Sequence, residues 1–89
     1  MKLYHGTSVE NAKDIDREGI KAVFGFVYMT PDLAVAKRFG EVIYEIDSDD
    51  LDDDYLGSYR EMLCDILKTD DFYHFGGDIS RHTIKKLTQ

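Results

Sequence analysis

Turn-forming residues divide this 89-residue chain into segments too short for anything but a small mixed fold. Glycine or proline follows most of the periodic stretches, at Gly6, Gly19, Pro31, Gly40 and residues 76–77. Within the stretches, apolar residues recur at every second position or at every third to fourth position, which indicates strands and helices respectively. The resulting order, β-α-β-α-β-α-β-β, predicts one compact α+β domain over residues 1–89, although periodicity alone leaves an α/β layout open.

The predicted elements are three helices and strands that form small antiparallel or mixed sheets. The predicted strands cover residues 2–5, 24–30, 41–47, 72–75 and 82–87, and the predicted helices cover 9–18, 31–39 and 55–68. Alternation is clearest over 41–47, and the longest apolar helical stripe lies in 55–68. Ser8 and Thr30 are suited to cap the first two helices. Phe24, Phe26 and Met29 are predicted to lie in the core.

The charge balance restricts the classes of partner. The chain carries a formal net charge of −7, and a field of this sign repels nucleic acid and anionic membranes. The net charge does not exclude a small anionic ligand, because such a ligand needs only a few hydrogen-bond donors around it. No stretch approaches the roughly 18 apolar residues of a membrane span. The single cysteine, Cys64, excludes an internal disulfide, so a reducing cytoplasm is expected.

Aspartates are concentrated in residues 47–54, where they fill six of eight positions. The simplest interpretation is a solvated connector, and the alternative is a surface that meets a basic partner or mimics nucleic acid. The segment lacks the glycine and the terminal glutamate of an EF-hand loop, and the three histidines show no metal-ligand spacing. No metal is therefore expected.

Three local patterns carry the chemistry. They are Leu-Tyr-His-Gly-Thr-Ser at residues 3–8, Gly-Phe-Val-Tyr-Met-Thr-Pro-Asp at 25–32, and Val-Ile-Tyr-Glu-Ile-Asp at 42–47, followed later by Gly77-Asp78-Ile79 and Ile84. In this order and spacing they resemble the ADP-ribosyltransferase superfamily, in particular the branch with a histidine on the first strand and a tyrosine on the second. Small RNA 2′-phosphotransferase-like and phage-type members are similar. The resemblance covers nearly the whole chain and implies a minimal ADP-ribosyltransferase-like fold that uses NAD as substrate.

The resemblance implies a role for each motif residue. His5 would hydrogen-bond the nicotinamide ribose, Gly6 would let the backbone approach the nicotinamide amide, and Tyr28 would stack on the nicotinamide ring. Thr7 and Thr30 would line the same cleft with hydroxyl groups. These side chains suit the roles: a neutral imidazole offers one donor and one acceptor, and a tyrosine offers a flat apolar face. The alternatives are a half-buried strand histidine, a turn glycine and a sheet-packing tyrosine.

The family also requires an acid on a late strand, usually a glutamate, which holds a ribose hydroxyl and stabilises the oxocarbenium cation. The expected position here falls at or beside Phe72, which is not acidic. Asp71 is the nearest carboxylate and is the candidate catalytic acid, acting with His5 and Tyr28. Glu45 and Asp78 are the alternatives.

Three functions follow from these residues. The leading hypothesis is transfer of ADP-ribose from NAD to a protein or a nucleic acid, with protein favoured by the acidic charge and a phage or bacterial setting suited to the small size. The second is a binding module that keeps the cleft without the reaction and binds a nucleotide, or a basic protein through residues 47–54. The third is removal of an RNA 2′-phosphate, which ranks last because the four arginines are dispersed.

Overall fold

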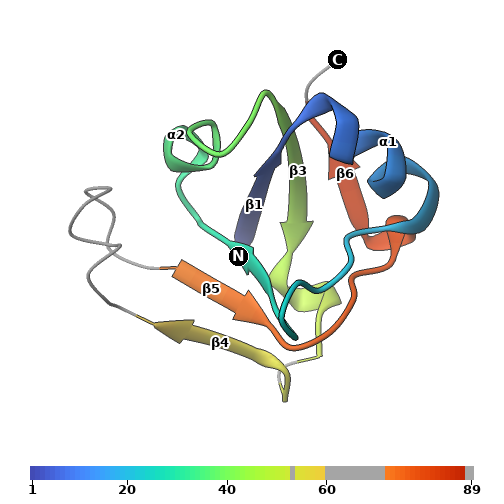
Figure 1. Ribbon diagram of the computed structural model, residues 1–89. Coiled ribbons are helices and arrows are strands. Elements are labelled where there is room, and N and C mark those ends of the chain that lie inside the picture. The colour runs from blue at the N-terminus through green and yellow to red at the C-terminus, as the bar shows by residue number, and fades with distance from the viewer. Residues whose placement is uncertain (53, 60–71, 88–89) are drawn as a thin grey trace.

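Two three-stranded antiparallel sheets and two short α-helices make up the part of the chain that the computed structural model describes, residues 1–52, 54–59 and 72–87 (Figure 1). The strands are β1 (Lys2–Thr7), β2 (Val27–Met29), β3 (Val42–Asp47), β4 (Leu56–Tyr59), β5 (Phe72–Phe75) and β6 (Ile84–Lys86). The helices are α1 (Val9–Glu18) and α2 (Leu33–Ala36), with 3-10 turns η1 (Ser48–Asp50) and η2 (Arg81–Thr83). The α+β prediction is therefore confirmed.

The first sheet has the strand order β1-β3-β6, and the second has the order β2-β5-β4. β1 and β3 pair along their full length, from Lys2 opposite Asp47 to Thr7 opposite Val42. Neighbouring residues of the central strand β3 point to opposite faces of the sheet. The Tyr44 hydroxyl therefore reaches α1, whereas the side chain of Ile43 lies on the face that packs against α2. Both faces are covered, which explains why Val42, Ile43, Tyr44 and Ile46 are all buried.

A polar network ties α1 to the first sheet. The Tyr44 hydroxyl donates to Asp16 Oδ1 at 2.6 Å and lies 3.2 Å from the Ala12 carbonyl oxygen, while Lys86 Nζ donates to the second Asp16 oxygen at 2.8 Å. Burial, together with the hydrogen bond to Asp16, raises the pKa of Tyr44 well above its usual range. Tyr44 thus stays neutral and remains a donor under all ordinary conditions. The network orients α1 and so fixes the polar face that this helix turns toward the functional site.

The ends of α1 match the sequence prediction. Ser8 Oγ accepts a hydrogen bond from the Asn11 amide at 3.2 Å, and the Gly19 amide donates to the Ile15 carbonyl at 2.8 Å. Gly19 has φ +84°, a region that L side chains rarely adopt, and a Cβ there would collide with the backbone of Ile79. Both termini are therefore set by local chemistry that is visible in the sequence.

The predicted third helix is wrong where it can be compared. Leu56–Tyr59 forms β4, which pairs with β5, and residues 60–68 lie outside the described residues. Gly57 and Ser58 are weak helix formers, and β5 offers an edge with free backbone donors and acceptors. Strand pairing with that edge is therefore more favourable than the helix that the spacing of the apolar residues predicts.

The second helix begins later and is shorter than predicted. Asp32, not Thr30, is its N-cap: Asp32 Oδ1 accepts from the Ala34 amide at 2.9 Å. Thr30 instead belongs to a backbone bridge with Tyr4, and its Oγ1 accepts from the Asp32 amide at 3.1 Å. The last turn, through Phe39, is tightened by hydrogen bonds of the i to i−3 type.

The predicted strand over 24–30 begins with a tight turn. Val23 and Phe26 exchange two backbone hydrogen bonds, of 2.9 and 3.2 Å, around Phe24 and Gly25, whose φ angles are +53° and +88°. Two positive φ angles in a two-residue loop define a type I′ turn, which favours asparagine and glycine rather than a bulky side chain. Phe24 is 97% exposed and Phe26 40%, so the prediction that they lie in the core is wrong, whereas Met29 is buried as predicted.

We expect Phe24→Asn to raise the free energy of unfolding by about 0.5–1 kcal/mol, because it relieves a left-handed conformation and exposes no buried surface. Urea denaturation followed by far-UV circular dichroism measures the change. Val23→Asn, next to it but without a positive φ, is the control and should give no gain. A loss of stability in Phe24→Asn would mean that the ring makes contacts that outweigh its strain.

Candidate functional site

Among the described residues, an isolated backbone bridge joins the two sheets, between Tyr4 of β1 and Thr30, which follows β2. The Tyr4 amide donates to the Thr30 carbonyl at 2.8 Å, and the Thr30 amide donates to the Tyr4 carbonyl at 3.0 Å. One residue further along β1, a side chain takes the place of the next backbone contact: His5 Nδ1 lies 2.9 Å from the Tyr28 carbonyl oxygen. β1 and β2 therefore separate beyond the bridge, and the His5 ring spans the space between them.

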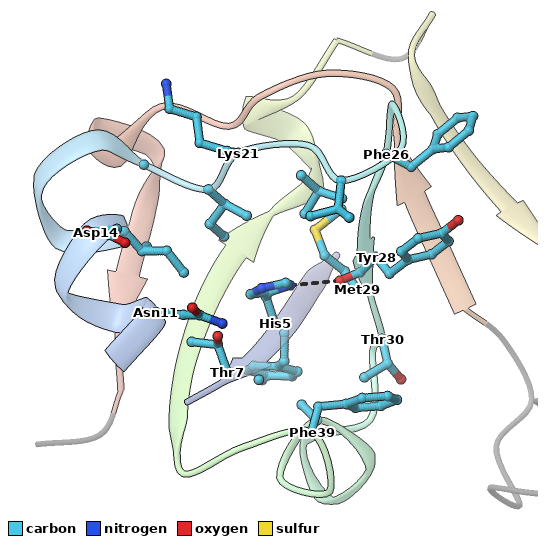
Figure 2. A pocket seen from close by; sticks show the side chains of 18 of the residues that line it. His5, Thr7, Asn11, Asp14, Lys21, Phe26, Tyr28, Met29, Thr30 and Phe39 are labelled. Carbon is cyan, nitrogen blue, oxygen red and sulfur yellow. Dashed lines mark hydrogen bonds between the residues drawn. The ribbon is translucent and has the colours of Figure 1, made fainter. Parts of the chain in front are cut away.

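A cavity of about 650 Å³ opens beside this ring, between β1, α1 and β2 (Figure 2). All five residues predicted to contact the cofactor line it: His5, Gly6, Thr7, Tyr28 and Thr30. They come from two chain segments more than 20 positions apart that the Tyr4–Thr30 bridge brings together. The predicted clustering of these residues is therefore seen in the fold, while their roles stay predictions.

The contact between His5 and Tyr28 fixes the tautomer of the imidazole. A carbonyl oxygen can only accept a hydrogen bond, so Nδ1 carries the proton and Nε2 of the neutral ring is an acceptor. Burial lowers the pKa of His5, and the bond to Tyr28 only partly opposes this effect. His5 is therefore neutral at pH 7 and can accept a hydrogen bond from a ligand hydroxyl.

Tyr28 contributes differently from the prediction. Val27 and Met29 are buried, so the intervening Tyr28 side chain projects from the other face of β2, where it is 48% exposed. Its ring centroid lies 6.3 Å from that of Phe26, and Figure 2 shows both rings on the side of β2 away from His5. The carbonyl group of Tyr28, and not its phenol, makes the contact with His5.

Gly6 has a packing role that the sequence did not indicate. A Cβ at this position would collide with the carbonyl group of Ala36, and would lie 3.4 Å from Ile43 Cδ1. Gly40 is in the same situation against the backbone of Thr7. These two glycines let α2 and the segment after it lie directly on β1. Gly6 is thus required for the wall of the cavity whether or not a ligand touches it.

One face of α1 supplies polar groups that sequence reasoning missed. Asn11, Asp14 and Glu18 line the cavity together with Lys21 from the segment that follows the helix. Their spacing of three and four residues places the three α1 side chains on one helical face. The same spacing was visible in the sequence, but an exposed polar face is the ordinary state of a surface helix. Only the position of β2 shows that this face borders a cavity.

The candidate acids differ in position. Asp71 lies outside the described residues. Glu45 pairs with Lys2 at 3.2 Å, and Asp78 accepts from the Ala22 amide at 2.8 Å, and neither is among the residues that line the cavity. Within the described part of the chain, the carboxylates that line it are those of Asp14 and Glu18.

No group of three or more His, Cys, Asp or Glu side chains among the described residues is placed to hold a metal ion. In the same part of the chain, no helix is both long and apolar enough to cross a membrane.

Comparison with known proteins adds no relative. No family model matches this chain, and no curated protein or solved structure matches it either. Functional inference therefore depends on the residues and on the geometry of the cavity.

Substitution of Gly6 by alanine should lower the free energy of unfolding by about 2–3 kcal/mol, because the new methyl group overlaps the Ala36 carbonyl. Gly77→Ala is the control, since a Cβ there meets only Phe75 Cε2 at 3.6 Å and should change stability by less than about 0.5 kcal/mol. Urea denaturation of both variants measures these changes in the free energy of unfolding. Equal stabilities would contradict the close packing of β1 on α2.

The half-buried His5 should make stability depend on pH. Its pKa is lower in the folded state than the ordinary value of 6.5, so the unfolded chain binds more protons between those two values. Stability is therefore complete above pH 6.5 and falls on acidification, by up to about 1.4 kcal/mol per pH unit within that window. Urea unfolding at pH 7.5, 6.5 and 5.5 should show a steeper loss for the wild type than for His5→Gln, which keeps a donor without a titrating group. Parallel pH profiles would contradict the assignment.

Proposed function

We propose that this chain binds NAD in the cavity between β1, α1 and β2 and transfers ADP-ribose from it to a protein acceptor. The observation that carries the proposal is the convergence of His5, Gly6, Thr7, Tyr28 and Thr30 on one cavity. These residues were singled out from their motifs alone. Their convergence supports a site that is built from both segments.

The size and polarity of the cavity support binding of the nicotinamide riboside half of NAD. A volume of about 650 Å³ is in the range of small-molecule sites. Neutral His5 accepts a hydrogen bond from a ribose hydroxyl through Nε2. Phe26 and Tyr28 are among the residues that line the cavity, although the Tyr28 ring projects from the other face of β2. Among the described lining residues Lys21 is the cation, and its side chain is largely exposed. The diphosphate is therefore expected beside Lys21, whose ammonium group lies 3.7 Å from Asp78 Oδ2 and would exchange that exposed pair for the phosphate.

The proposed reaction breaks one bond and forms another at C1′ of the nicotinamide ribose. The C1′–N bond breaks, and nicotinamide leaves with the electron pair as a neutral molecule. The ribose is left as an oxocarbenium cation, which a carboxylate stabilises. A nucleophile of the acceptor protein then bonds to C1′ and gives up its proton to the solvent. We assign the carboxylate to Asp71, which precedes β5, the central strand of the second sheet.

Calorimetric titration with NAD tests binding at this site. We expect His5→Ala to weaken binding about 5- to 10-fold, the effect of one neutral hydrogen bond. His82→Ala is the matched control, because His82 is exposed on η2 and does not line the cavity. Absence of NAD binding by the wild type, or equal affinities of the two variants, would overturn the proposed site.

Incubation with labelled NAD and a protein extract tests the reaction separately from binding. We expect label on protein with the wild type, and loss of that label with Asp71→Asn at unchanged NAD affinity. Binding of NAD without transfer by the wild type would support a binding module instead. Transfer that persists in Asp71→Asn would contradict the role given to Asp71.

A further inference from the structure

A second hollow of about 470 Å³ lies between the 23–26 turn, residues 54–56 and residues 74–76. We call it the aromatic notch; Phe26, Asp54, Tyr55, Leu56, His74 and Gly76 line it. It shares only Phe26 with the cavity beside His5. A ligand of the notch therefore need not depend on NAD.

The aromatic side chains that border the notch are held in place by their neighbours. The Phe26 ring meets the His74 ring edge to face, with centroids 5.1 Å apart, and the Tyr55 ring lies 6.3 Å from that of Phe75. Phe26 and Tyr55 nevertheless stay 40% and 58% exposed. Large aromatic surfaces that are both oriented and open to solvent are suited to contact a ligand.

Gly76 keeps the space between these two aromatic residues open. Its amide donates to the Tyr55 carbonyl at 2.8 Å, which places it beside Tyr55. A Cβ at Gly76 would lie 3.9 Å from Phe26 Cε1 and 3.9 Å from Tyr55 Cβ. These are ordinary contacts, so a side chain is tolerated here but would occupy the notch.

The negative charge at the notch favours a cationic ligand. Asp54 brings the one carboxylate among the described lining residues, and its amide donates to Asp52 Oδ1 at 3.0 Å, which orders the approach to Tyr55. The notch also adjoins the 47–54 segment of a chain whose net charge is −7. Aromatic faces beside a carboxylate favour a guanidinium group, because it is planar, stacks on rings and pairs with carboxylates through two parallel hydrogen bonds.

Exposed apolar residues at the rim indicate that the guanidinium belongs to a protein. Val23 is 61% exposed and Phe24 97% exposed, at the turn that forms one side of the notch. A free arginine offers only its short methylene stem to cover these side chains, whereas a protein surface offers a larger apolar area. A second copy of this chain would bring the same net charge of −7 and would be repelled.

We propose that the aromatic notch binds an arginine side chain on the surface of a basic protein partner. The guanidinium stacks on the rings of Phe26 and Tyr55 and pairs with the Asp54 carboxylate. The apolar surface next to that arginine covers Val23 and Phe24. The proposal extends beyond NAD binding, and each can fail without the other.

Nitrogen-15 NMR titration with the peptide acetyl-Leu-Arg-Leu-amide tests the notch directly. We expect saturable shift changes centred on residues 25–26, 54–56 and 74–76, with those of Lys21 and Thr7 unchanged. The same peptide with citrulline, the neutral isostere of arginine, should bind at least 5-fold more weakly. Equal binding of the two peptides, shifts centred on the His5 cavity, or no binding at millimolar peptide would each overturn the proposal.

Two pairs of matched variants separate the notch from general charge and general packing. Asp54→Asn should weaken the arginine peptide about 3- to 5-fold, while Asp50→Asn, with the same change of net charge but outside the notch, should leave the affinity unchanged. Gly76→Ala should weaken it while Gly77→Ala does not, because only the first methyl group enters the notch. Equal losses within either pair would contradict binding at this place.

Discussion

The Tyr4–Thr30 bridge is the constraint on which the rest of this structure depends. It is the point where the two sheets are held together, and it lies at the end of the short strand β2. β1 continues along β3, whereas β2 pairs with β5 in the other sheet, and the bridge between them stays isolated. The next contact between the two segments is made by a side chain, because His5 Nδ1 lies 2.9 Å from the Tyr28 carbonyl oxygen. The cavity, the tautomer of His5 and the lowered pKa of its ring therefore share one geometric origin.

Close backbone contacts determine the opposite side of the same cavity. Gly6 and Gly40 have no side chain where β1 meets the backbone of α2 and of the segment that follows it. Such contacts allow almost no sliding, since any shift brings main-chain atoms into overlap. α1 is held in a different way, by the Tyr44–Asp16–Lys86 network, which is polar and partly exposed. The wall formed by β1 is therefore held by backbone packing, and the wall formed by α1 is held by side-chain hydrogen bonds.

Local chemistry could be predicted from the sequence, and non-local pairing could not. Ser8 and Gly19 set the ends of α1 through groups a few residues away, and the alternation over 42–47 matched a strand that is covered on both faces. Leu56–Tyr59 has helical spacing but pairs with β5, whose position in the chain is distant. Thr30 is a residue type that often caps helices, but its backbone amide and carbonyl groups are hydrogen-bonded to Tyr4. In both cases, backbone pairing with a residue distant in the sequence determined which of two locally favourable conformations formed.

The same difference between local chemistry and non-local pairing explains which parts of the candidate sites could be predicted from the sequence. The sequence indicates His5 and Tyr28 because an imidazole suits a ribose hydroxyl and a phenol ring suits stacking on another ring. The phenol of Tyr28, however, projects from the other face of β2. That face is where the rings of Phe26, Tyr28 and His74 lie near one another. Phe26 and His74 also line the aromatic notch, which is thus built beside β2 rather than from it. The His5 side offers a neutral acceptor in a partly enclosed cavity, whereas the outer side offers open rings beside a carboxylate. The two hollows are therefore separate in chemistry, and Phe26 is the residue that borders both.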